Sequence, residues 1–381
     1  MELQESLTAK FDRTMLLPDS GIQSHASNLL ILPNGDTFCT WFSGTEEGTD
    51  DITIFMAELR AGTDSWSKPV PMSNNPGRSD QNPVLFAAPD GDIWLLYTSQ
   101  VGGNEDTAII QYRVSHDNGK TWSMQSNLFP GESGLFIRHP LVVTANGEWL
   151  LPLYHCVVKN DGKPWDGSYD YSCVRVSQDS GQTWKEYEVP DSQGCVQMSI
   201  VKLQNNAGYV GFFRSRWADN IYRSFSNDGS RWTPPKAIDL PNNNSSIQAA
   251  LLPDGNIILA FNKSSAEDAT VRRLSLFSEK TTAKETSNKK AAKTAFWGAP
   301  RAPLTVAISE DNGKTWPYVR NIAEGSGYAL TNNSKDKKNR EFSYPSVKPT
   351  INGKIALTFT YFRQNIAFVE FTEDWVKEEK E

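Results

Sequence analysis

One eight-residue pattern recurs along the chain and constrains its fold more than any other feature. It reads SHDNGKTW at residues 115–122, SQDSGQTW at 177–184 and SEDNGKTW at 309–316, with a shorter copy, SNDGSRW, at 226–232. Degenerate copies end at Trp66 and Trp375. A motif that returns at a spacing of roughly 50–60 residues indicates a repeat architecture, in which each unit is one small supersecondary element.

A second turn signal runs in step with the first. Asn-Gly or Asp-Gly pairs stand between apolar runs at Asn34-Gly35, Asp90-Gly91, Asn146-Gly147, Asp254-Gly255 and Asn352-Gly353. Such a pair is typical of a tight hairpin, whose two central residues both take positive φ. We therefore expect each unit to hold two apolar strands, a more polar third strand, the Asp/Gly/Trp turn and a fourth strand.

Six such units predict an all-β fold, a six-bladed β-propeller formed as a single domain by residues 1–381. The opening segment KFDRTMLL (10–17) has no unit of its own, and we expect it to pair as the outer strand of the last blade and close the ring. The long interval between Trp232 and Trp316 indicates a polar loop insertion at about residues 263–300, which includes the Lys-rich run 278–295.

Composition excludes several classes of function. The net charge of −7 argues against nucleic acid as a partner. No apolar run is long enough to span a membrane, and the first residues lack a secretory signal, so we expect a cytoplasmic protein, or a secreted one if a leader peptide has been removed. The four cysteines are predicted to be buried thiols. Neither a metal nor another cofactor is expected, and the chain is predicted to be a monomer or a small homo-oligomer.

The repeated motif itself is predicted to be scaffold. Its Asp and Ser side chains can bond nearby backbone N–H groups, its Gly takes a positive φ and its Trp packs between blades. Copies spaced around a ring cannot all line one pocket. Both series of turns lie on one face of the propeller, so we place the functional site on the opposite face.

The segments expected on that opposite face are rich in cationic side chains. They contain three of the four histidines (His25, His139 and His155) and six arginines: Arg78, Arg138, Arg214, Arg216, Arg301 and Arg363. Several guanidinium groups aimed at one funnel suit a carboxylate ligand, which each can bind bidentately.

The repeated eight-residue motif is of the kind called an Asp-box. Because its copies occur in register on a six-bladed fold, the chain resembles the sialidase (neuraminidase) superfamily over essentially its whole length. Members of that superfamily hold a substrate carboxylate with three arginines and use an Asp acid/base and a Tyr nucleophile paired with Glu. The resemblance implies that Tyr344 in EFSYPSV is the nucleophile and that Asp51 in TEEGTDDI is the acid/base, with Asp50 and Glu47 close by. It implies Arg301 as one carboxylate ligand, and either Arg216 or Arg223 as another.

Two positions depart from the superfamily pattern. His25 stands where the first arginine is expected, and Gln197 stands where the glutamate is expected. A glutamine cannot act as base for a tyrosine, whose ordinary pKa is about 10, whereas a histidine suits proton transfer. We therefore expect a terminal carboxylate-bearing sugar and leave its identity open. Further substrate-binding candidates are Arg78, Arg138, His139, His155 and Gln248.

Three hypotheses follow, each with an oligosaccharide or glycoconjugate as partner. The first is an exo-acting, sialidase-like glycoside hydrolase that acts on a terminal acidic sugar. The second is a lyase that cleaves a uronate linkage by β-elimination, as rhamnosyl-glucuronate lyases do, with roles for His25, Tyr344 and the Arg138-His139 pair. The third is a non-catalytic glycan-binding propeller.

Overall fold

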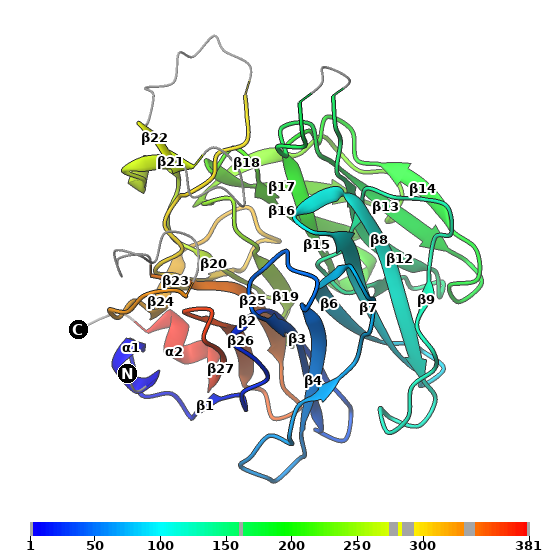
Figure 1. Cartoon of the computed structure of the whole chain (residues 1–381). Coiled ribbons are helices and arrows are strands. Elements are labelled where there is room, and N and C mark those ends of the chain that lie inside the picture. Colours follow the sequence, from blue (N-terminus) through cyan, green and yellow to red (C-terminus); the bar gives the residue numbers. More distant parts are fainter. Residues whose placement is uncertain (1–2, 160–162, 274–280, 284–292, 331–339, 379–381) are drawn as a thin grey trace.

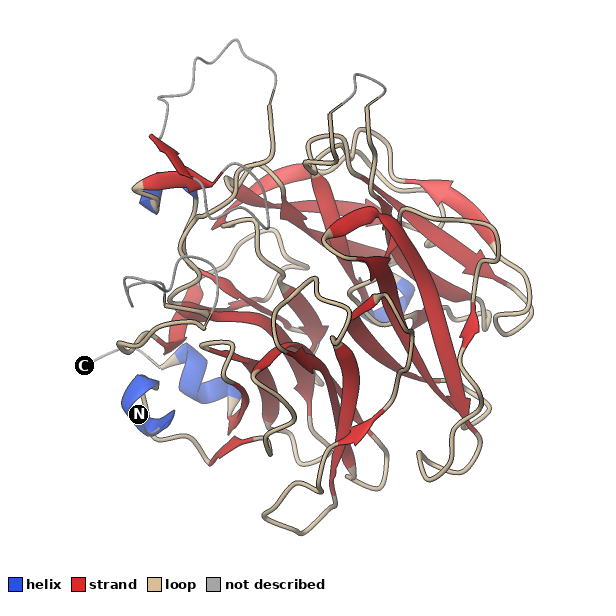
Figure 2. Cartoon of the chain, in the orientation of Figure 1, coloured by secondary structure: helices blue, strands red, loops and turns tan. Residues whose placement is uncertain are grey.

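A ring of six antiparallel sheets forms the body of the molecule (Figures 1 and 2). The computed structural model describes residues 3–159, 163–273, 281–283, 293–330 and 340–378. Helices in the described part of the chain are short and lie outside the sheets (Figure 2). The prediction of an all-β, six-bladed propeller is confirmed.

Each blade is built from consecutive strands, the innermost first. Blade 1 consists of β2 (Gln23–Ile31), β3 (Thr37–Gly44), β4 (Thr53–Leu59) and β5 (Val70–Pro71), and blade 2 of β6 (Ser79–Ala87), β7 (Ile93–Val101), β8 (Asn104–Ser115) and β9 (Ser126–Asn127). In blade 3 the inner strand is split into β10 (Leu135–Phe136) and β11 (Val142–Val143), followed by β12 (Trp149–His155), β13 (Tyr171–Ser177) and β14 (Lys185–Glu188).

The other three blades follow the same order. Blade 4 consists of β15 (Cys195–Lys202), β16 (Tyr209–Ser215), β17 (Asn220–Ser226) and β18 (Lys236–Pro241), and blade 5 of β19 (Gln248–Leu251), β20 (Ile257–Asn262), β23 (Leu304–Ser309) and β24 (Tyr318–Ala323). Blade 6 consists of β25 (Phe342–Pro349), β26 (Ile355–Tyr361), β27 (Asn365–Phe371) and β1 (Arg13–Leu16).

The N-terminal strand closes the ring as predicted. Strand β1 pairs antiparallel with β27, from Arg13 opposite Glu370 to Leu16 opposite Ala367. Both ends of the chain therefore lie at the same blade, where the helices α1 (Leu3–Ser6) and α2 (Glu373–Lys377) also lie (Figure 1). Closure removes the open sheet edge that a linear array of blades would leave between its first and last units.

The hairpins lie where the Asn-Gly and Asp-Gly pairs predict them, but their turns differ from the expected type. In the first, the N–H of Gly35 donates to the carbonyl of Leu32, and only Gly35 of the central pair has a positive φ, at 88°. Pro33 explains the difference, because its ring fixes φ near −65° and so favours a type I turn followed by a left-handed glycine. A closely related arrangement, Pro-Asp-Gly, occurs at Gly91 and Gly255.

The Asp-box turns are held by bonds within the motif. In residues 115–122, Asp117 accepts hydrogen bonds from the N–H and hydroxyl of Thr121 at 2.8 and 2.6 Å, and Ser115 accepts one from the N–H of Gly119 at 2.8 Å. The indole of Trp122 donates to the Gly119 carbonyl at 3.1 Å. These bonds lock the turn locally, as expected for a scaffold element.

The glycines of these turns allow neighbouring blades to approach closely. A Cβ on Gly119 of blade 2 would lie 2.9 Å from the Phe38 ring of blade 1, and one on Gly313 of blade 5 would lie 2.5 Å from the Phe212 ring of blade 4. The motif thus fixes the contact between blades. Blade 6 is an exception: Trp375 lies in α2, which is capped by Thr372, and not in a box turn.

The remaining expectations about the scaffold can be placed as well. The polar insertion at about 263–300 lies between β20 and β23, and its described part holds η2 (Ala266–Asp268) and a hairpin of β21 (Val271–Arg273) and β22 (Thr281–Ala283); a further short helix, η1 (Gln204–Asn206), follows β15. All four cysteines are buried and free, as predicted. None of the helices in the described residues has the length and hydropathy needed to cross a lipid bilayer.

Candidate functional site

A β-bulge recurs in the inner strands of four blades, near the residues of the candidate site. The pairing register shifts after His25, Gln81, Val196 and Ser343, and a residue of each bulge has a positive φ: Ala26, Asn82, Gln197 and Tyr344. A bulge redirects the side chains around it. At Tyr344 the φ of 53° is costly for an aromatic residue, and such backbone strain is concentrated at functional sites.

Tyr344 is surrounded by guanidinium groups. Arg214 donates from Nη1 to the phenol oxygen of Tyr344 at 2.7 Å. The guanidinium carbons of Arg138, Arg301 and Arg214 lie 5.2, 5.6 and 5.9 Å from the centre of the phenol ring. We call the group around it the Tyr344 cluster; its members are Tyr344, His25, Glu47, Arg138, Arg214, Arg301, Glu341 and Arg363.

Glu341 is the buried carboxylate that positions two of these arginines. Its Oε1 accepts from Arg301 at 2.8 Å, and both of its oxygens accept from Nε of Arg363 at 3.1 Å. Ser343 donates to the same carboxylate at 2.6 Å. Burial alone would raise the pKa of Glu341, but the charges of Arg363 and Arg301 outweigh it and hold the pKa well below its ordinary value. Glu341 is therefore ionised at neutral pH.

His25 lies against Tyr344, with 4.2 Å between ring centres, but both of its nitrogens are engaged. Burial, reinforced by the charge of Arg363, lowers the pKa of His25 well below its ordinary value, so the ring is neutral. Arg363 Nη2 lies 3.2 Å from Nε2, and a guanidinium can only donate, so the ring proton lies on Nδ1 and is donated to Thr360 at 2.7 Å. His25 thus acts here as a neutral acceptor that orients Arg363.

The cluster carries a surplus of positive charge. Arg138 is fully buried and bonds only neutral groups, among them the hydroxyl of Ser246 at 3.0 Å and the carbonyl of Tyr344 at 3.2 Å. Its Nη1 has no hydrogen-bond partner among the described residues. Burial lowers the pKa of Arg138 to about 10 and also lowers that of Arg214. Among the described residues, the ion pairs of these four guanidinium groups involve only the carboxylates of Glu47 and Glu341, so the arrangement favours an anionic ligand.

The loop between β3 and β4 brings one carboxylate into the cluster and keeps another outside it. Glu47 pairs with Nη1 of Arg363 at 2.5 Å. Asp51 instead accepts from the N–H and hydroxyl of Thr45, both at 2.9 Å, and from Thr49 at 2.5 Å. Partial burial opposes ionisation of Asp51, but the hydrogen bonds from Thr49 and Thr45 outweigh it and lower its pKa. Asp51 stabilises the conformation of the loop, whereas Glu47 reaches Arg363 in the Tyr344 cluster.

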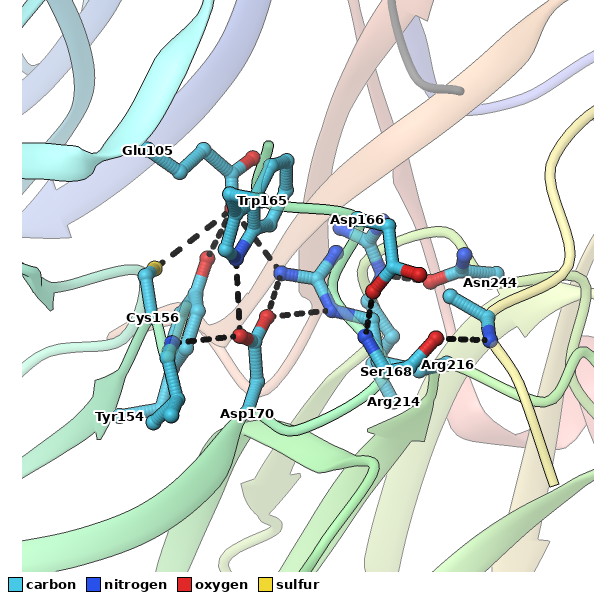
Figure 3. Close-up of polar contacts among 12 residues, drawn as sticks. Glu105, Tyr154, Cys156, Trp165, Asp166, Ser168, Asp170, Arg214, Arg216 and Asn244 are labelled. Carbon is cyan, nitrogen blue, oxygen red and sulfur yellow. Dashed lines mark hydrogen bonds and ion pairs between the residues drawn. The ribbon is translucent and has the colours of Figure 1, made fainter. Parts of the chain in front are cut away.

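A second buried network borders the cluster (Figure 3). Arg216 donates to Asp170 at 2.7 and 3.0 Å and to Glu105 at 2.9 Å. Asp170 also accepts from the Trp165 indole at 2.9 Å. Nε and Nη2 of Arg216 are therefore engaged by protein carboxylates, whereas its Nη1 has no hydrogen-bond partner among the described residues. Arg214, two residues earlier on the chain, lies at Tyr344 instead.

Two groups of side chains have the composition of metal ligands, and both have other partners. The ligand atoms of Glu105, Cys156 and Asp170 lie within 4.8 Å of one another, but Arg216 already forms ion pairs with both carboxylates. Burial raises the pKa of Glu105 and of Asp170 in spite of that guanidinium. The other group is His155, Cys173 and Glu186, in which His155 bonds Glu186 at 3.0 Å. These arrangements suit ion pairs better than cation sites.

The end of the insertion covers the side of the site next to Arg216. The N–H of Phe296 donates to the Arg216 carbonyl at 2.7 Å, and the Phe296 carbonyl accepts from Asn244 at 2.9 Å. The Trp297 ring lies 5.2 Å from the Arg216 guanidinium and 5.9 Å from that of Arg214. Residues 296 and 297 therefore form one wall of the site beside Arg214 and Arg216.

The structure brings together His25, Arg138, Arg301 and Tyr344 from the predicted set and places several others elsewhere. Arg223 donates to the Gly313 carbonyl in an Asp-box turn. Arg78 holds the carbonyls of Ser99 and Thr107 in blade 2, at 2.6 and 2.9 Å. None of these partners belongs to the Tyr344 cluster.

Four further predicted residues make no hydrogen bond or ion pair with the cluster among the described contacts. His155 stacks on Tyr171 and bonds Glu186 in blade 3. Gln197 is buried in the bulge of β15, and its side-chain oxygen has no hydrogen-bond partner among the described residues. His139 and Gln248 line a cavity at the other end of the central channel.

Sequence reasoning assigned no role to three residues that the structure places at the centre. Arg214 and Arg363 belonged to the arginine set expected on this face, yet nothing distinguished them from Arg78. Glu341 lies three residues before Tyr344 in the segment REFSYP. The sequence feature that could have identified Glu341 is that it is a carboxylate close to the expected nucleophile, on a face where most charged residues are arginines.

Comparisons with known proteins agree with this architecture. The model of the BNR repeat-like domain family matches residues 35–357. A Hadza microbial sialidase, Hz136, is similar in structure with a TM-score of 0.67 and 15% identity, over 93% of this chain and 67% of that one. The NanB sialidase of Streptococcus pneumoniae gives a TM-score of 0.66 and 13% identity, over 99% and 73%.

A protein of unknown function from Dyadobacter fermentans gives a TM-score of 0.68 and 14% identity, over 95% of this chain and 98% of that chain. No curated protein sequence matches this chain. At these identities the structural likeness establishes the fold alone.

Proposed function

Because the chain belongs to the BNR repeat-like domain family and has a sialidase-like fold, we propose that it is an exo-acting glycoside hydrolase. Its substrate is a terminal, carboxylate-bearing sugar of an oligosaccharide. Tyr344 is the nucleophile, and Arg301, Arg214 and Arg138 bind the carboxylate. This proposal goes beyond the fold likeness and depends on the chemistry of the Tyr344 cluster.

One observation carries the proposal: the Tyr344 oxygen accepts a 2.7 Å hydrogen bond from Arg214 inside a cluster with surplus positive charge. Negative charge that develops on the phenol oxygen is stabilised by this donor, which is already in place and needs no reorganisation. The same surplus attracts the carboxylate of the sugar. A cluster built only for packing has no reason to leave Arg138 and Arg214 without a carboxylate partner.

The reaction can be written with each proton accounted for. The phenol proton of Tyr344 passes to water, and the phenolate oxygen bonds to the anomeric carbon as the glycosidic carbon–oxygen bond breaks. An acid gives its proton to the departing oxygen. Water then attacks the anomeric carbon, and the same group, now a base, takes the proton of that water. The bond to Tyr344 breaks, and the phenolate takes back the proton that the solvent received in the first step.

Glu47 is the group we assign to that proton transfer, in place of Asp51. Its carboxylate reaches the cluster through Arg363, while the hydrogen bonds of Asp51 are directed into its own loop. Asp51 also has a lowered pKa, which disfavours the protonated form that an acid needs. Asp51 keeps the loop in the conformation that presents Glu47.

The lyase and the binding-only hypotheses have less support. A β-elimination needs a free base to remove the C5 proton, and both nitrogens of His25 are engaged by Arg363 and Thr360. A binding-only propeller does not require the strained backbone at Tyr344.

The discriminating experiment uses a panel of oligosaccharides with terminal sialic, glucuronic or galacturonic acid, with the products analysed by mass and by ultraviolet absorbance. Hydrolysis adds one water per cleavage, whereas elimination yields an unsaturated, ultraviolet-absorbing uronate. Tyr344→Phe should reduce the hydrolytic rate by about a thousandfold or more. The matched control is Tyr97→Phe in blade 2, whose hydroxyl bonds Gln125, and it should retain full activity. Equal activity of the two variants would refute the assignment.

The assignment of the acid is tested separately with Glu47→Gln and Asp51→Asn. A variant that lacks the acid should lose most activity on natural linkages and recover it on aryl glycosides, whose leaving group needs no proton. We expect this recovery for Glu47→Gln alone. If Asp51→Asn shows the recovery instead, the proton donor is Asp51.

A further inference from the structure

A cavity lies at the late ends of the inner strands, opposite the ends that carry the Tyr344 cluster. Its volume is about 650 Å³, within the range of small-molecule sites. It lies among the late residues of the inner strands and the segments that follow them, contributed by blades 1, 3, 4, 5 and 6. We call it the rear cavity and define it by the polar residues His139, Ser199, Lys202, Gln248 and Lys348 with the aliphatic side chains around them.

The rear cavity contains a buried histidine with few polar partners. His139 is 1% exposed, and neither of its ring nitrogens makes a hydrogen bond of ordinary geometry with the described residues, although the backbone of Gln197 lies close enough to affect its charge. Burial lowers the pKa of His139 well below its ordinary value, and the charges of Arg138 and Lys348 lower it further. A neutral imidazole that offers both a donor and an acceptor is costly to bury without partners.

A lysine lines the same cavity without a counter-ion. Lys348 on β25 is half-buried and makes no ion pair or hydrogen bond with the described residues. Burial lowers its pKa to about 8. Lys202, on β15, brings a second ammonium group, which donates to the Val143 carbonyl at 3.3 Å. No Asp or Glu of the described residues lines the cavity, so its charge is positive.

Apart from Gln204, Asn205 and Asn206 at one side, the rest of the lining is apolar. Leu30, Leu141, Ile200, Leu203 and Leu251 come from four different blades and surround the space between the polar residues. Such a lining binds the hydrocarbon part of a ligand and leaves the polar groups to fix its orientation.

From this geometry we propose that the rear cavity is a second binding site, which takes a small monocarboxylic acid with an apolar body. Lys348 binds the carboxylate, and the leucine and isoleucine side chains enclose the hydrocarbon. His139, deeper in the channel, meets a hydroxyl or carbonyl group where the ligand carries one. A singly charged group fits better than phosphate, because one unpaired ammonium cannot compensate a dianion with several acceptor oxygens.

This site is separate from the one proposed for catalysis. Arg138 and His139 are adjacent in sequence but serve opposite ends of the channel: Arg138 lies beside Tyr344, and His139 lines the rear cavity. Loss of activity at Tyr344 therefore leaves the rear cavity intact, and the proposal does not depend on the reaction.

The test is isothermal titration calorimetry of the whole protein with octanoate and naphthoate, and with acetate and inorganic phosphate as comparison ligands. We expect the two apolar acids to bind with dissociation constants below about 1 mM, and acetate and phosphate at least tenfold more weakly. The ring resonances of His139, assigned by nuclear magnetic resonance with a His139→Gln variant, should shift on addition of naphthoate.

Three variants locate the binding. Lys348→Met keeps the length of the side chain and removes its charge, and it should weaken octanoate binding by about tenfold or more. Lys354→Met is the matched control and should have no effect, because Lys354 lies in the turn that follows the same strand and is paired with Asp12. Arg301→Met removes a carboxylate ligand of the Tyr344 cluster and should also leave octanoate binding unchanged.

Three results would overturn the proposal. The first is the absence of octanoate and naphthoate binding at about 10 mM, well above the expected dissociation constant. The second is a loss of binding in Arg301→Met with none in Lys348→Met, which would place the acids in the Tyr344 cluster. The third is phosphate binding as tight as that of the apolar acids.

Discussion

Lys348 gives a prediction about stability that can be worked out from the structure. Its pKa is about 8 in the folded protein, against 10.5 for an ordinary lysine, because burial disfavours its charged form. A difference of about 2.5 pKa units corresponds to about 3 kcal/mol, since each unit is about 1.4 kcal/mol. At pH 7 the lysine is charged in both states, so the folded state carries nearly the whole of this penalty. Lys348→Met should therefore raise the free energy of unfolding by about 3 kcal/mol at pH 7.

The pH dependence of that gain has a definite sign. Between pH 8 and 10.5 the folded protein has lost the proton that the unfolded chain still holds, so wild-type stability rises with pH relative to the variant. The advantage of Lys348→Met should fall to about 2 kcal/mol at pH 9 and about 1 kcal/mol at pH 10. Above pH 10.5 it should vanish.

Urea unfolding of wild type, Lys348→Met and Lys354→Met at these pH values measures the effect. Lys354 is exposed and paired with Asp12, so its variant should differ little from wild type at any of these pH values. The reasoning is refuted if Lys348→Met is destabilised at pH 7, or if its advantage is the same at pH 7 and pH 10.

Three other predictions concern the ion pairs and the scaffold. Arg216→Met leaves Asp170 and Glu105 buried without their cation. It should therefore lower the free energy of unfolding, measured in urea at pH 7, by about 3–5 kcal/mol. A loss smaller than about 1 kcal/mol would contradict the assigned network. Glu341 has a lowered pKa, so the contribution of its carboxylate to the free energy of unfolding is complete above about pH 4.5 and is lost as the pH falls through its folded-state pKa. The difference in stability between wild type and Glu341→Gln should therefore be constant from about pH 5 to 7 and shrink below about pH 4.5. Arg223→Met should cost about 1 kcal/mol through its lost bond and leave catalysis unchanged, so a large loss of hydrolytic rate would return Arg223 to the site.

What the sequence could predict of the site depended on local position. Tyr344 and Arg301 were singled out by the resemblance to sialidases, each at or directly before the start of a strand. The sequence could not tell which of Arg214, Arg216 and Arg223 lies beside Tyr344. These three residues lie within ten positions of one another, yet one bonds Tyr344, one bonds Asp170 and one bonds an Asp-box turn. Strand alternation and the start of the next strand send neighbouring side chains in different directions.

The sequence by itself determined the propeller, because the bonds that build it are local. The Asp-box closes on itself between Ser115 and Trp122, and each Gly-containing hairpin joins adjacent strands. Tertiary structure alone decided the site, because its contacts join residues that the ring brings together from distant parts of the chain. Arg363 meets His25 across 338 positions and Glu47 across 316. No local pattern specifies such pairs, because only closure of the ring sets which blades meet across the channel.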